Sequence, residues 1–239
     1  MTSGFVDIHC HAVFGVDDGA KDFEEMQSML RLAHEQGVEH VICTSHATPG
    51  IERFPVEDYL SHLQMAQTWC TSEGLPIQVH SGCEILYTDS SARMVAEGFI
   101  PTLAEGWTVL VEFGPDTPYE RMKEAARLFG VQGYNVVFAH IERYEALRST
   151  KKIEELRNEY GVTMQMNSRT VYAKKGFFED RWVKKVLEHG LIDVIGSDAH
   201  NVSSRPCHLQ KAYDYLCSHF DEEYADQLCS LNARKLLKL

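Results

Sequence analysis

The residues best suited to chemistry gather first in a short stretch, DIHCHAVFGVDDG at residues 7–19, which holds two histidines and three aspartates. If this stretch is a β-strand, the alternation of side chains places Asp7, His9 and His11 on one face. Imidazole and carboxylate groups both bind metal ions, but a single His-x-His pair also occurs at ordinary polar strand ends. The stretch therefore suggests a metal site that other parts of the chain must complete.

Strand-like and helix-like patterns alternate along the whole chain. Apolar, β-rich runs predict seven strands, at residues 5–9, 40–44, 77–84, 108–113, 135–140, 162–167 and 192–197. Amphipathic segments predict helices at 22–36, 55–73, 118–129, 151–160, 179–189 and 209–219, with a shorter one near 221–229. This order predicts an α/β fold with a parallel sheet, either a closed barrel or an open doubly wound sheet.

The placement of polar residues distinguishes these two architectures. In a barrel every strand delivers its C-terminal end to one mouth, whereas an open sheet concentrates its site at a single switch point. Six of the seven expected strands end in, or lead directly into, residues that can bind a metal: His9, His11, Asp18, His46, Glu84, Glu112, His140, Asp198 and His200. This distribution favours the barrel, and we treat residues 1–239 as a single barrel domain because no linker or repeat interrupts them.

Nine candidate ligands are too many for one ion, which takes four to six. They suit two or three divalent ions that share a bridging carboxylate. A mixture of histidine and carboxylate without thiolate favours Mn, Fe or Zn over Ca. Ions about 3.5–4 Å apart can together hold a bridging hydroxide and a phosphoryl oxygen, so the expected reaction is metal-assisted hydrolysis of a phosphoester.

Composition excludes several other classes of protein. A formal net charge of −12 argues against binding to nucleic acid or to an anionic membrane surface. No apolar run approaches the ~18 residues that span a bilayer, and the N-terminal residues do not resemble a signal peptide. The seven cysteines are scattered, which predicts a reduced, cytoplasmic protein. None of them is followed six residues later by arginine, so the motif of cysteine-dependent phosphatases is missing.

Two arginines lie beside the expected strand ends. Arg143 follows His140, and Arg205 follows His200. Because the guanidinium group offers a planar fork of donors that suits phosphate oxygens, both are candidate catalytic residues that hold the phosphate. We leave Asp17 out of the ligand set, although the sequence does not separate it from Asp18, and we expect Asp7 to orient a ligand.

The motifs DIHCH, GCEI and SDAH, with His46 and His140, resemble the polymerase and histidinol phosphatase (PHP) superfamily. The segments GVDDGAKDFEEMQSML, IPTL, AHIERYEAL and SDAHNVSSRPCHL resemble the metal-dependent protein-tyrosine phosphatases of bacterial capsule and exopolysaccharide synthesis. The resemblance implies a distorted (β/α)7 TIM-like barrel that holds three divalent ions, with Mn as the expected metal. It also implies hydrolysis of phosphotyrosine on an autophosphorylating bacterial tyrosine kinase, through a metal-bridging hydroxide.

The resemblance also implies how the ligands divide among three ions. The first ion has His9, His11, Glu84 and Asp198; the second has Glu84 as a bridge with Glu112 and His140; the third has Asp18, His46 and His200.

Two alternatives remain open at this stage. One is a phosphatase of the same superfamily that acts on a small phosphomonoester such as histidinol phosphate, and the other is a non-catalytic, metal-stabilised docking module.

Overall fold

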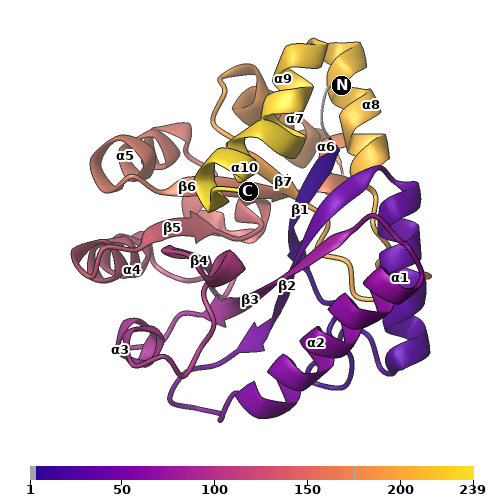
Figure 1. The fold of residues 1–239 in the computed structure, drawn as a ribbon. Coiled ribbons are helices and arrows are strands. Elements are labelled where there is room, and N and C mark those ends of the chain that lie inside the picture. Colours follow the sequence, from indigo (N-terminus) through magenta and orange to yellow (C-terminus); the bar gives the residue numbers. More distant parts are fainter. Residues whose placement is uncertain (1–3, 175) are drawn as a thin grey trace.

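The computed structural model describes residues 4–174 and 176–239. Its seven strands are all parallel, follow the order β1 to β7, and curl into a nearly closed barrel surrounded by helices (Figure 1). The strands are β1 (Phe5–Cys10), β2 (Val38–Ala47), β3 (Gln78–Leu86), β4 (Thr108–Glu112), β5 (Asn135–Phe138), β6 (Thr163–Asn167) and β7 (Val194–Gly196). The predicted α/β barrel architecture is therefore confirmed, and the open sheet is wrong.

Helices connect successive strands as the sequence predicts. The longer ones are α1 (Phe23–Glu35), α2 (Val56–Ser72), α4 (Tyr119–Val131), α5 (Thr150–Tyr160), α7 (Phe177–Glu188) and α8 (Leu209–His219). Four short helices complete the set: α3 (Ser91–Ala96), α6 (Ser168–Tyr172), α9 (Glu222–Asp226) and α10 (Asn232–Leu237). The sequence did not predict α3 or α6, because one or two turns give too little periodicity to recognise. No helix in the described ranges is long and apolar enough to cross a membrane.

The start of α1 shows how local sequence sets an element boundary. The side chain of Asp22 accepts a hydrogen bond from the backbone N–H of Glu25 at 2.9 Å, which satisfies one of the free donors at the helix N-terminus. The helix ends before Gly37, whose φ of +84° lies in the region that favours glycine. These contacts fix α1 directly after the loop that carries Asp17 and Asp18.

The barrel closes along a seam between its first and last strands. β7 has only three residues, and the only strand-type pairing of β1 with the segment after β7 is the bridge between Cys10 and Ala199. Side chains complete the seam, because Asp7 Oδ1 accepts from the backbone N–H of Ser197 at 2.8 Å. The Ser197 hydroxyl donates to the His9 carbonyl at 3.1 Å. The seam thus joins the two strand ends that carry most of the histidine-rich motifs.

Strand β1 changes the face that it presents to the barrel interior. Val6 and Ile8 pack inside with residues such as Ile42 and Leu110. The pairing with β2 then shifts between Asp7 and Cys10, where β1 has one residue more than its partner. Such a bulge redirects the side chains that follow it. His9 and His11 consequently face the mouth, and strict alternation from Asp7 to His11, as predicted from the sequence, is wrong.

Candidate metal centre

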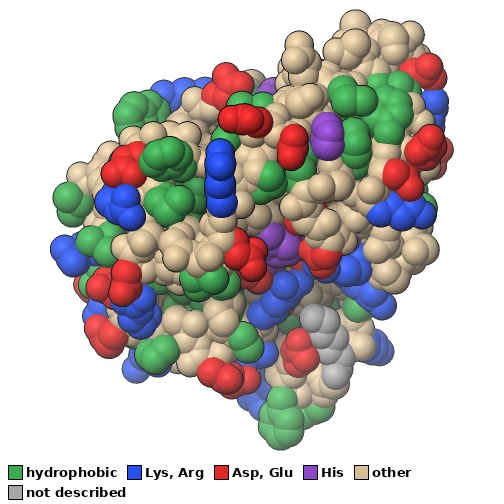
Figure 2. Space-filling model, turned by 90° about the horizontal axis from the view of Figure 1, so that it is seen from below, with side chains coloured by type: hydrophobic (Ala, Val, Ile, Leu, Met, Phe, Trp, Pro, Cys, Tyr) green, Lys and Arg blue, Asp and Glu red, His purple; other side chains and the backbone are tan. Residues whose placement is uncertain are grey.

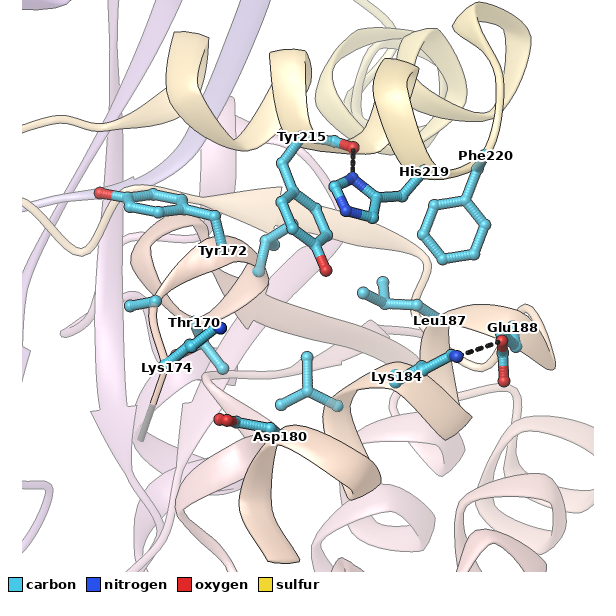
Figure 3. Close-up of a pocket in the computed structure, with 13 residues that line it drawn as sticks. Thr170, Tyr172, Lys174, Asp180, Lys184, Leu187, Glu188, Tyr215, His219 and Phe220 are labelled. Atoms are coloured by element: carbon cyan, nitrogen blue, oxygen red, sulfur yellow. Dashed lines mark hydrogen bonds and ion pairs between the residues drawn. The ribbon is translucent and has the colours of Figure 1, made fainter. Parts of the chain in front are cut away.

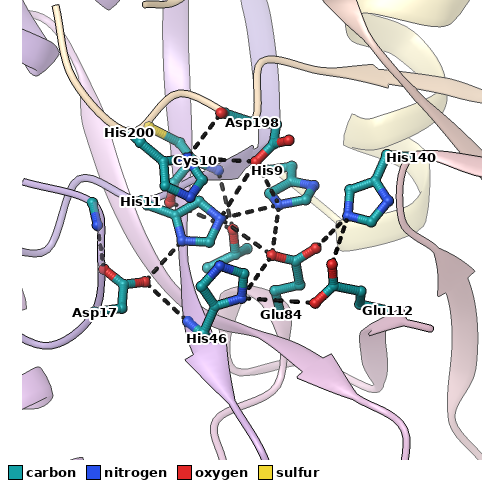
Figure 4. A network of polar contacts seen from close by, with 12 residues as sticks. His9, Cys10, His11, Asp17, His46, Glu84, Glu112, His140, Asp198 and His200 are labelled. Atoms are coloured by element: carbon teal, nitrogen blue, oxygen red, sulfur yellow. Dashed lines mark hydrogen bonds and ion pairs between the residues drawn. The ribbon is translucent and has the colours of Figure 1, made fainter. Parts of the chain in front are cut away.

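All nine candidate ligands converge at the C-terminal mouth of the barrel, as Figure 4 shows for eight of them. Six strands and the loops that follow them supply these side chains, and Asp18 comes from the loop before α1. Most of the ligands are buried, whereas the Asp18 side chain is 65% exposed and the His46 side chain 36% exposed. The ligands that reach solvent lie on the same side, so the centre has a closed floor and an open entrance.

One group of four donors has the spacing of ligands around a single ion. His9, His11, Glu84 and Asp198 offer atoms that all lie within 4.8 Å of one another. The His9 Nε2 atom is 3.2 Å from both His11 Nε2 and Glu84 Oε2, and His11 Nε2 is 3.3 Å from the same oxygen. Donors bound to one ion at ~2.1 Å lie roughly 3.0–3.4 Å apart at tetrahedral or octahedral angles. This group therefore fits a divalent ion.

Two further groups share members with the first, and His140 lies beside Glu84 and Glu112 but outside all three groups. His46, Glu84 and Glu112 make one, with His46 Nδ1 at 3.1 Å from Glu84 Oε2. His140 Nε2 lies against the other Glu84 oxygen at 2.6 Å and is 3.4 Å from Glu112.

The third group contains His11, Asp18, His46 and His200. Asp18 Oδ1 is 3.4 Å from Nε2 of both His46 and His200. His46 thus belongs to the second and third groups, one with each ring nitrogen. Glu84 joins the first group to the second, and His11 joins the first to the third.

Two ligands sit on unusual backbone. His140 and Asp198 have φ of +29° and +54°, in a region that side chains other than glycine seldom adopt. Both come directly after a strand, at the point where the chain must turn sharply to bring the side chain over the mouth. Gly196 helps in a different way, because a Cβ atom there would lie 2.8 Å from His9 Cβ. The local chain geometry is thus shaped around the ligand positions.

Residues behind the ligands hold the imidazole rings. Asp17 Oδ2 is 2.8 Å from His11 Nδ1, so Asp17 orients a candidate ligand and lies outside the three donor groups. Gln165 Oε1 lies 3.2 Å from His9 Nδ1 and also accepts from the His140 backbone N–H at 2.6 Å. Such partners fix the ring orientation and tautomer of metal-binding histidines.

Asp7 does not orient a ligand ring, contrary to the expectation from the sequence. Its carboxylate accepts instead from backbone N–H groups, including that of Ser197 at the seam. Burial raises the pKa of Asp7 to about 6, and the hydrogen bonds from Ser197 oppose that rise only in part. Asp7 is therefore a residue of the barrel closure.

The pKa shifts of His11, His140 and Glu84 all indicate that positive charge is favoured at the mouth. Burial lowers the pKa of His11, but hydrogen bonds to Asp17 and Glu84 outweigh burial and raise it to about 10. In the same way, Glu112 and Glu84 raise the pKa of His140 to about 9 against the effect of burial. Burial alone would raise the pKa of Glu84, yet the surrounding histidines hold it well below its usual range. Protons occupy sites here that divalent ions could take.

Of the nine buried side-chain atoms that lack a hydrogen-bond partner among the described residues, two belong to candidate ligands: Glu84 Oε2 and His200 Nε2. Leaving such polar atoms unpaired in a protein interior is costly. Both atoms belong to the donor groups described above, and metal coordination would satisfy them. The residues present therefore fit the divalent ions that the sequence predicts.

Arg143 and Arg205 reach the same entrance from opposite sides of Asp198. Arg143 Nη2 bonds Asp198 Oδ2, and Arg205 Nη2 bonds Asp198 Oδ1 at 2.9 Å. Arg205 Nη1 is also 3.6 Å from Asp18 Oδ2. Both side chains are about two-fifths exposed. Two guanidinium groups thus flank the centre while keeping a face toward solvent.

Two cavities lie next to each other beside the centre. The first, of about 350 Å³, is lined by Arg143, Asp198 and Arg205 and by residues after β6. The second, of about 460 Å³, lies between α6, α7 and α8, and Figure 3 shows Tyr172, Tyr215 and Phe220 around it. Both cavities are lined by Thr170, Ala173 and Lys174. The entrance therefore continues away from the ligands as an elongated depression.

Residues 5–238 match the family model described as "Capsular polysaccharide synthesis, CpsB/CapC". The chain belongs to this family. It is 34% identical to the tyrosine-protein phosphatase CpsB of Streptococcus pneumoniae, over 97% of this chain and 98% of that protein. It is 29% identical to the tyrosine-protein phosphatase YwqE of Bacillus subtilis, over 98% of this chain and 91% of that one.

Solved structures agree with the family. A chain from the crystal structures of YwqE and CpsB, described as unique metal-dependent tyrosine phosphatases, matches with a TM-score of 0.87 and 27% identity, over 98% of this chain and 94% of that one. A histidinol phosphate phosphatase from Lactococcus lactis matches over 99% of this chain and 94% of that one, with a TM-score of 0.55 and 16% identity, which shows a shared fold alone. The resemblance to the capsule-type family is thereby confirmed.

For this member of the CpsB/CapC family, sequence reasoning missed Gln165, Tyr144 and Asn167. Tyr144 lies with its hydroxyl 3.3 Å from His140 Nδ1, and Asn167 donates to Asp198 Oδ2 at 2.7 Å. Asn167 stands where the sixth strand ends, so its position was a usable signal. Gln165 and Tyr144 had no such signal, because each contacts its partner only through the fold.

Proposed function

We propose that this chain is a metal-dependent protein-tyrosine phosphatase whose nine candidate ligands hold three divalent ions, with Mn as the expected metal. The observation that carries the proposal is a set of three donor groups that share His11, His46 and Glu84 and are flanked by two arginines. The CpsB and YwqE relatives are named tyrosine-protein phosphatases, which supports the same activity. When bound, divalent ions supply Lewis-acid polarisation of the phosphoryl group and of water.

The protein's own residues bind and orient the phosphate. Arg143 and Arg205 each present donors beside Asp198, and a dianionic phosphate would compete with that carboxylate for them. Tyrosine has a pKa of about 10, so its phenolate leaves with less need for proton donation than an alkoxide. We therefore assign no general acid.

A cysteine nucleophile does not fit this site. Burial raises the pKa of the thiols of Cys10, Cys43 and Cys83, which keeps them protonated and poorly nucleophilic. The seven cysteines are all free, which suits a reducing compartment, and we place the reaction in the cytoplasm as part of the proposal.

The proposed physiological substrate is an autophosphorylating bacterial tyrosine kinase of capsule or exopolysaccharide synthesis. This part follows from the family description, which refers to capsular polysaccharide synthesis. A protein substrate also suits the long depression that leads away from the centre, because a polypeptide could lie along both cavities.

The decisive experiment compares substrates and one matched pair of variants. With added Mn, the protein should hydrolyse a tyrosine-phosphorylated peptide much faster than histidinol phosphate. His140→Ala should abolish this turnover, because His140 contacts both Glu84 and Glu112. His80→Ala should not, because His80 contacts His40 and none of the candidate ligands.

Each alternative makes a different prediction. Preference for histidinol phosphate would replace the protein substrate with a small phosphomonoester. Equal, background-level turnover by the wild type and His140→Ala would favour a metal-stabilised docking module. Anomalous scattering at the metal edge would count the ions, and fewer than two would contradict the multinuclear centre.

A further inference from the structure

The first cavity beside the metal centre has two walls of different composition. Arg143, Asp198 and Arg205 form the wall shared with the centre. Arg169, Lys174 and His208 lie on the residues around α6 and α8 and have no part in the ligand groups. Seen from below in Figure 2, Lys and Arg side chains gather beside the histidine that is visible in the hollow. The second wall is therefore available for a role other than holding metal or the reacting phosphate.

A buried carboxylate ties the two walls together. Glu142 is 2% exposed, and its Oε1 accepts from the Asn167 backbone N–H at 3.1 Å and from the Thr170 hydroxyl at 2.8 Å. These two hydrogen bonds hold α6 in place at a residue before Arg169 and at a residue after it. Glu142 directly precedes Arg143 in the chain. The same two hydrogen bonds therefore fix the position of Arg169, in the second wall, relative to that of Arg143, in the first. The fold consequently fixes the backbone positions from which Arg143 and Arg169 extend.

The second wall also carries cations that are not neutralised within the protein. Arg143 and Arg205 both pair with Asp198, whereas no carboxylate of residues 4–174 and 176–239 forms an ion pair with Arg169 or Lys174. The side chains of Arg169 and Lys174 are exposed to solvent. His208 lies within the same cavity and can add a hydrogen bond. Unpaired cations at the edge of a cavity attract and hold anionic groups.

This local positive charge contrasts with the chain as a whole, which has a formal net charge of −12. The overall charge would repel an acidic substrate, whereas the unpaired cations of the cleft would attract it. The cavity that holds Arg169 shares Thr170, Ala173 and Lys174 with the aromatic-lined second cavity, so the path beyond the phosphate is long enough for several residues of a peptide. A small phosphomonoester has no flanking residues that could extend into the second cavity.

We propose that Arg169 and Lys174, with His208, form a specificity subsite that binds an Asp or Glu side chain flanking the phosphotyrosine of a protein substrate. The inference rests on the proposed function, because it deepens the substrate class of that same site. Arg169 and Lys174 act by holding the peptide, and Arg143 and Arg205 by holding the phosphate.

The test compares two phosphotyrosine peptides that differ only in flanking charge, one with Glu and Asp and the other with Gln and Asn. p-Nitrophenyl phosphate serves as a substrate with no flanking residues. For the wild type loaded with Mn, kcat/KM should be about 5–20-fold higher for the acidic peptide, as expected for one or two partly exposed ion pairs. The preference should fall as salt concentration rises.

Variants then locate the preference. Arg169→Glu and Lys174→Glu should each abolish or reverse it while kcat/KM for p-nitrophenyl phosphate stays within about twofold of the wild type. Arg169→Gln gives a milder change that keeps the side chain polar. Lys235→Glu is the matched control, because Lys235 is an exposed lysine on α10 at the other end of the barrel, and it should keep the full preference.

Three results would overturn the inference. The wild type could turn over both peptides equally, Arg169→Glu could slow all three substrates equally, or Lys235→Glu could remove the preference as strongly as Arg169→Glu. Failure of the proposed function is separable, since it appears as no hydrolysis of p-nitrophenyl phosphate or either peptide. In that case the same peptides with a non-hydrolysable phosphonate test the subsite by binding, and equal affinities would refute it.

Discussion

Asp17→Asn tests whether a residue that binds no metal in our assignment still controls metal affinity. Asp17 Oδ2 lies 2.8 Å from His11 Nδ1 and accepts from the His46 backbone N–H at 3.0 Å. Its Oδ1 accepts from the Gly19 N–H at 3.0 Å. The substitution keeps the size of the side chain and changes only its charge and one of its two oxygens.

The expected magnitude follows from these contacts. Asparagine has one acceptor oxygen, so its amide NH2 group faces a backbone N–H whichever way it is turned. An unpaired buried N–H costs about 1–3 kcal/mol. If the NH2 faces His11, Nδ1 must accept and the proton moves to Nε2, the nitrogen that faces Glu84. Loss of such an orienting partner typically weakens metal affinity about 10–100-fold, which equals roughly 1.4–2.8 kcal/mol.

The assay is equilibrium dialysis against buffers of fixed free Mn²⁺, followed by measurement of bound metal. Asp17→Asn should shift the whole titration to about 10–100-fold higher Mn²⁺. Asp18→Asn should instead remove one ion, because it deletes a proposed ligand from a single group. Asp116→Asn, at an exposed position, serves as the control. If Asp17→Asn binds Mn²⁺ as tightly as the control, the orienting role of Asp17 is wrong.

Three further predictions concern protons, stability and a helix cap. Metal binds neutral imidazole, whereas His11 and His140, with pKa values of about 10 and 9, are protonated at pH 7 without metal. Binding of metal should therefore release protons, and the affinity for metal should rise with pH. Calorimetry in two buffers of different ionisation enthalpy measures this release, and its absence would contradict the proposed ligands. Removing metal by chelation should lower Tm by about 5–10 °C. This corresponds to about 2.7 kcal/mol, the stabilisation that one site gives when free metal is present at 100 times the Kd of that site. An unchanged Tm would argue against bound ions. Asp22→Ala should lower the free energy of unfolding by about 1 kcal/mol in urea titrations, whereas Asp22→Ser should retain most of it.

The sequence predicted the barrel and its mouth because those features depend on local patterns. His46, Glu84 and Glu112 follow β-rich runs at matching positions, and parallel strands necessarily bring such ends together. The cap at Asp22 was equally readable from a few neighbouring residues. These predictions needed no knowledge of which strand lies beside which.

Features that depend on distant parts of the chain were beyond local patterns. Gln165 contacts His9 across 156 positions, and nothing in its neighbourhood marks it as a partner of histidine. The bulge in β1 arises from pairing with β2, so strict alternation misassigned Asp7. Asp17 and Asp18 differ only in which way the loop turns them, which becomes visible once His11 and His46 are in place.

The seam between β1 and β7 has a consequence for how the protein is made. Ser197 bonds Asp7 across 190 positions, and His9 and Asp198 face each other over the same gap. At a synthesis rate of about 5–20 residues per second, the first histidines wait roughly 10–40 s for their partners to leave the ribosome. A nascent chain that ends before β7 therefore lacks one of the four donors of the first group, Asp198. Tight metal occupancy would mark molecules whose translation and folding are both complete, and a chain cut short before β7 would be unable to keep its ions.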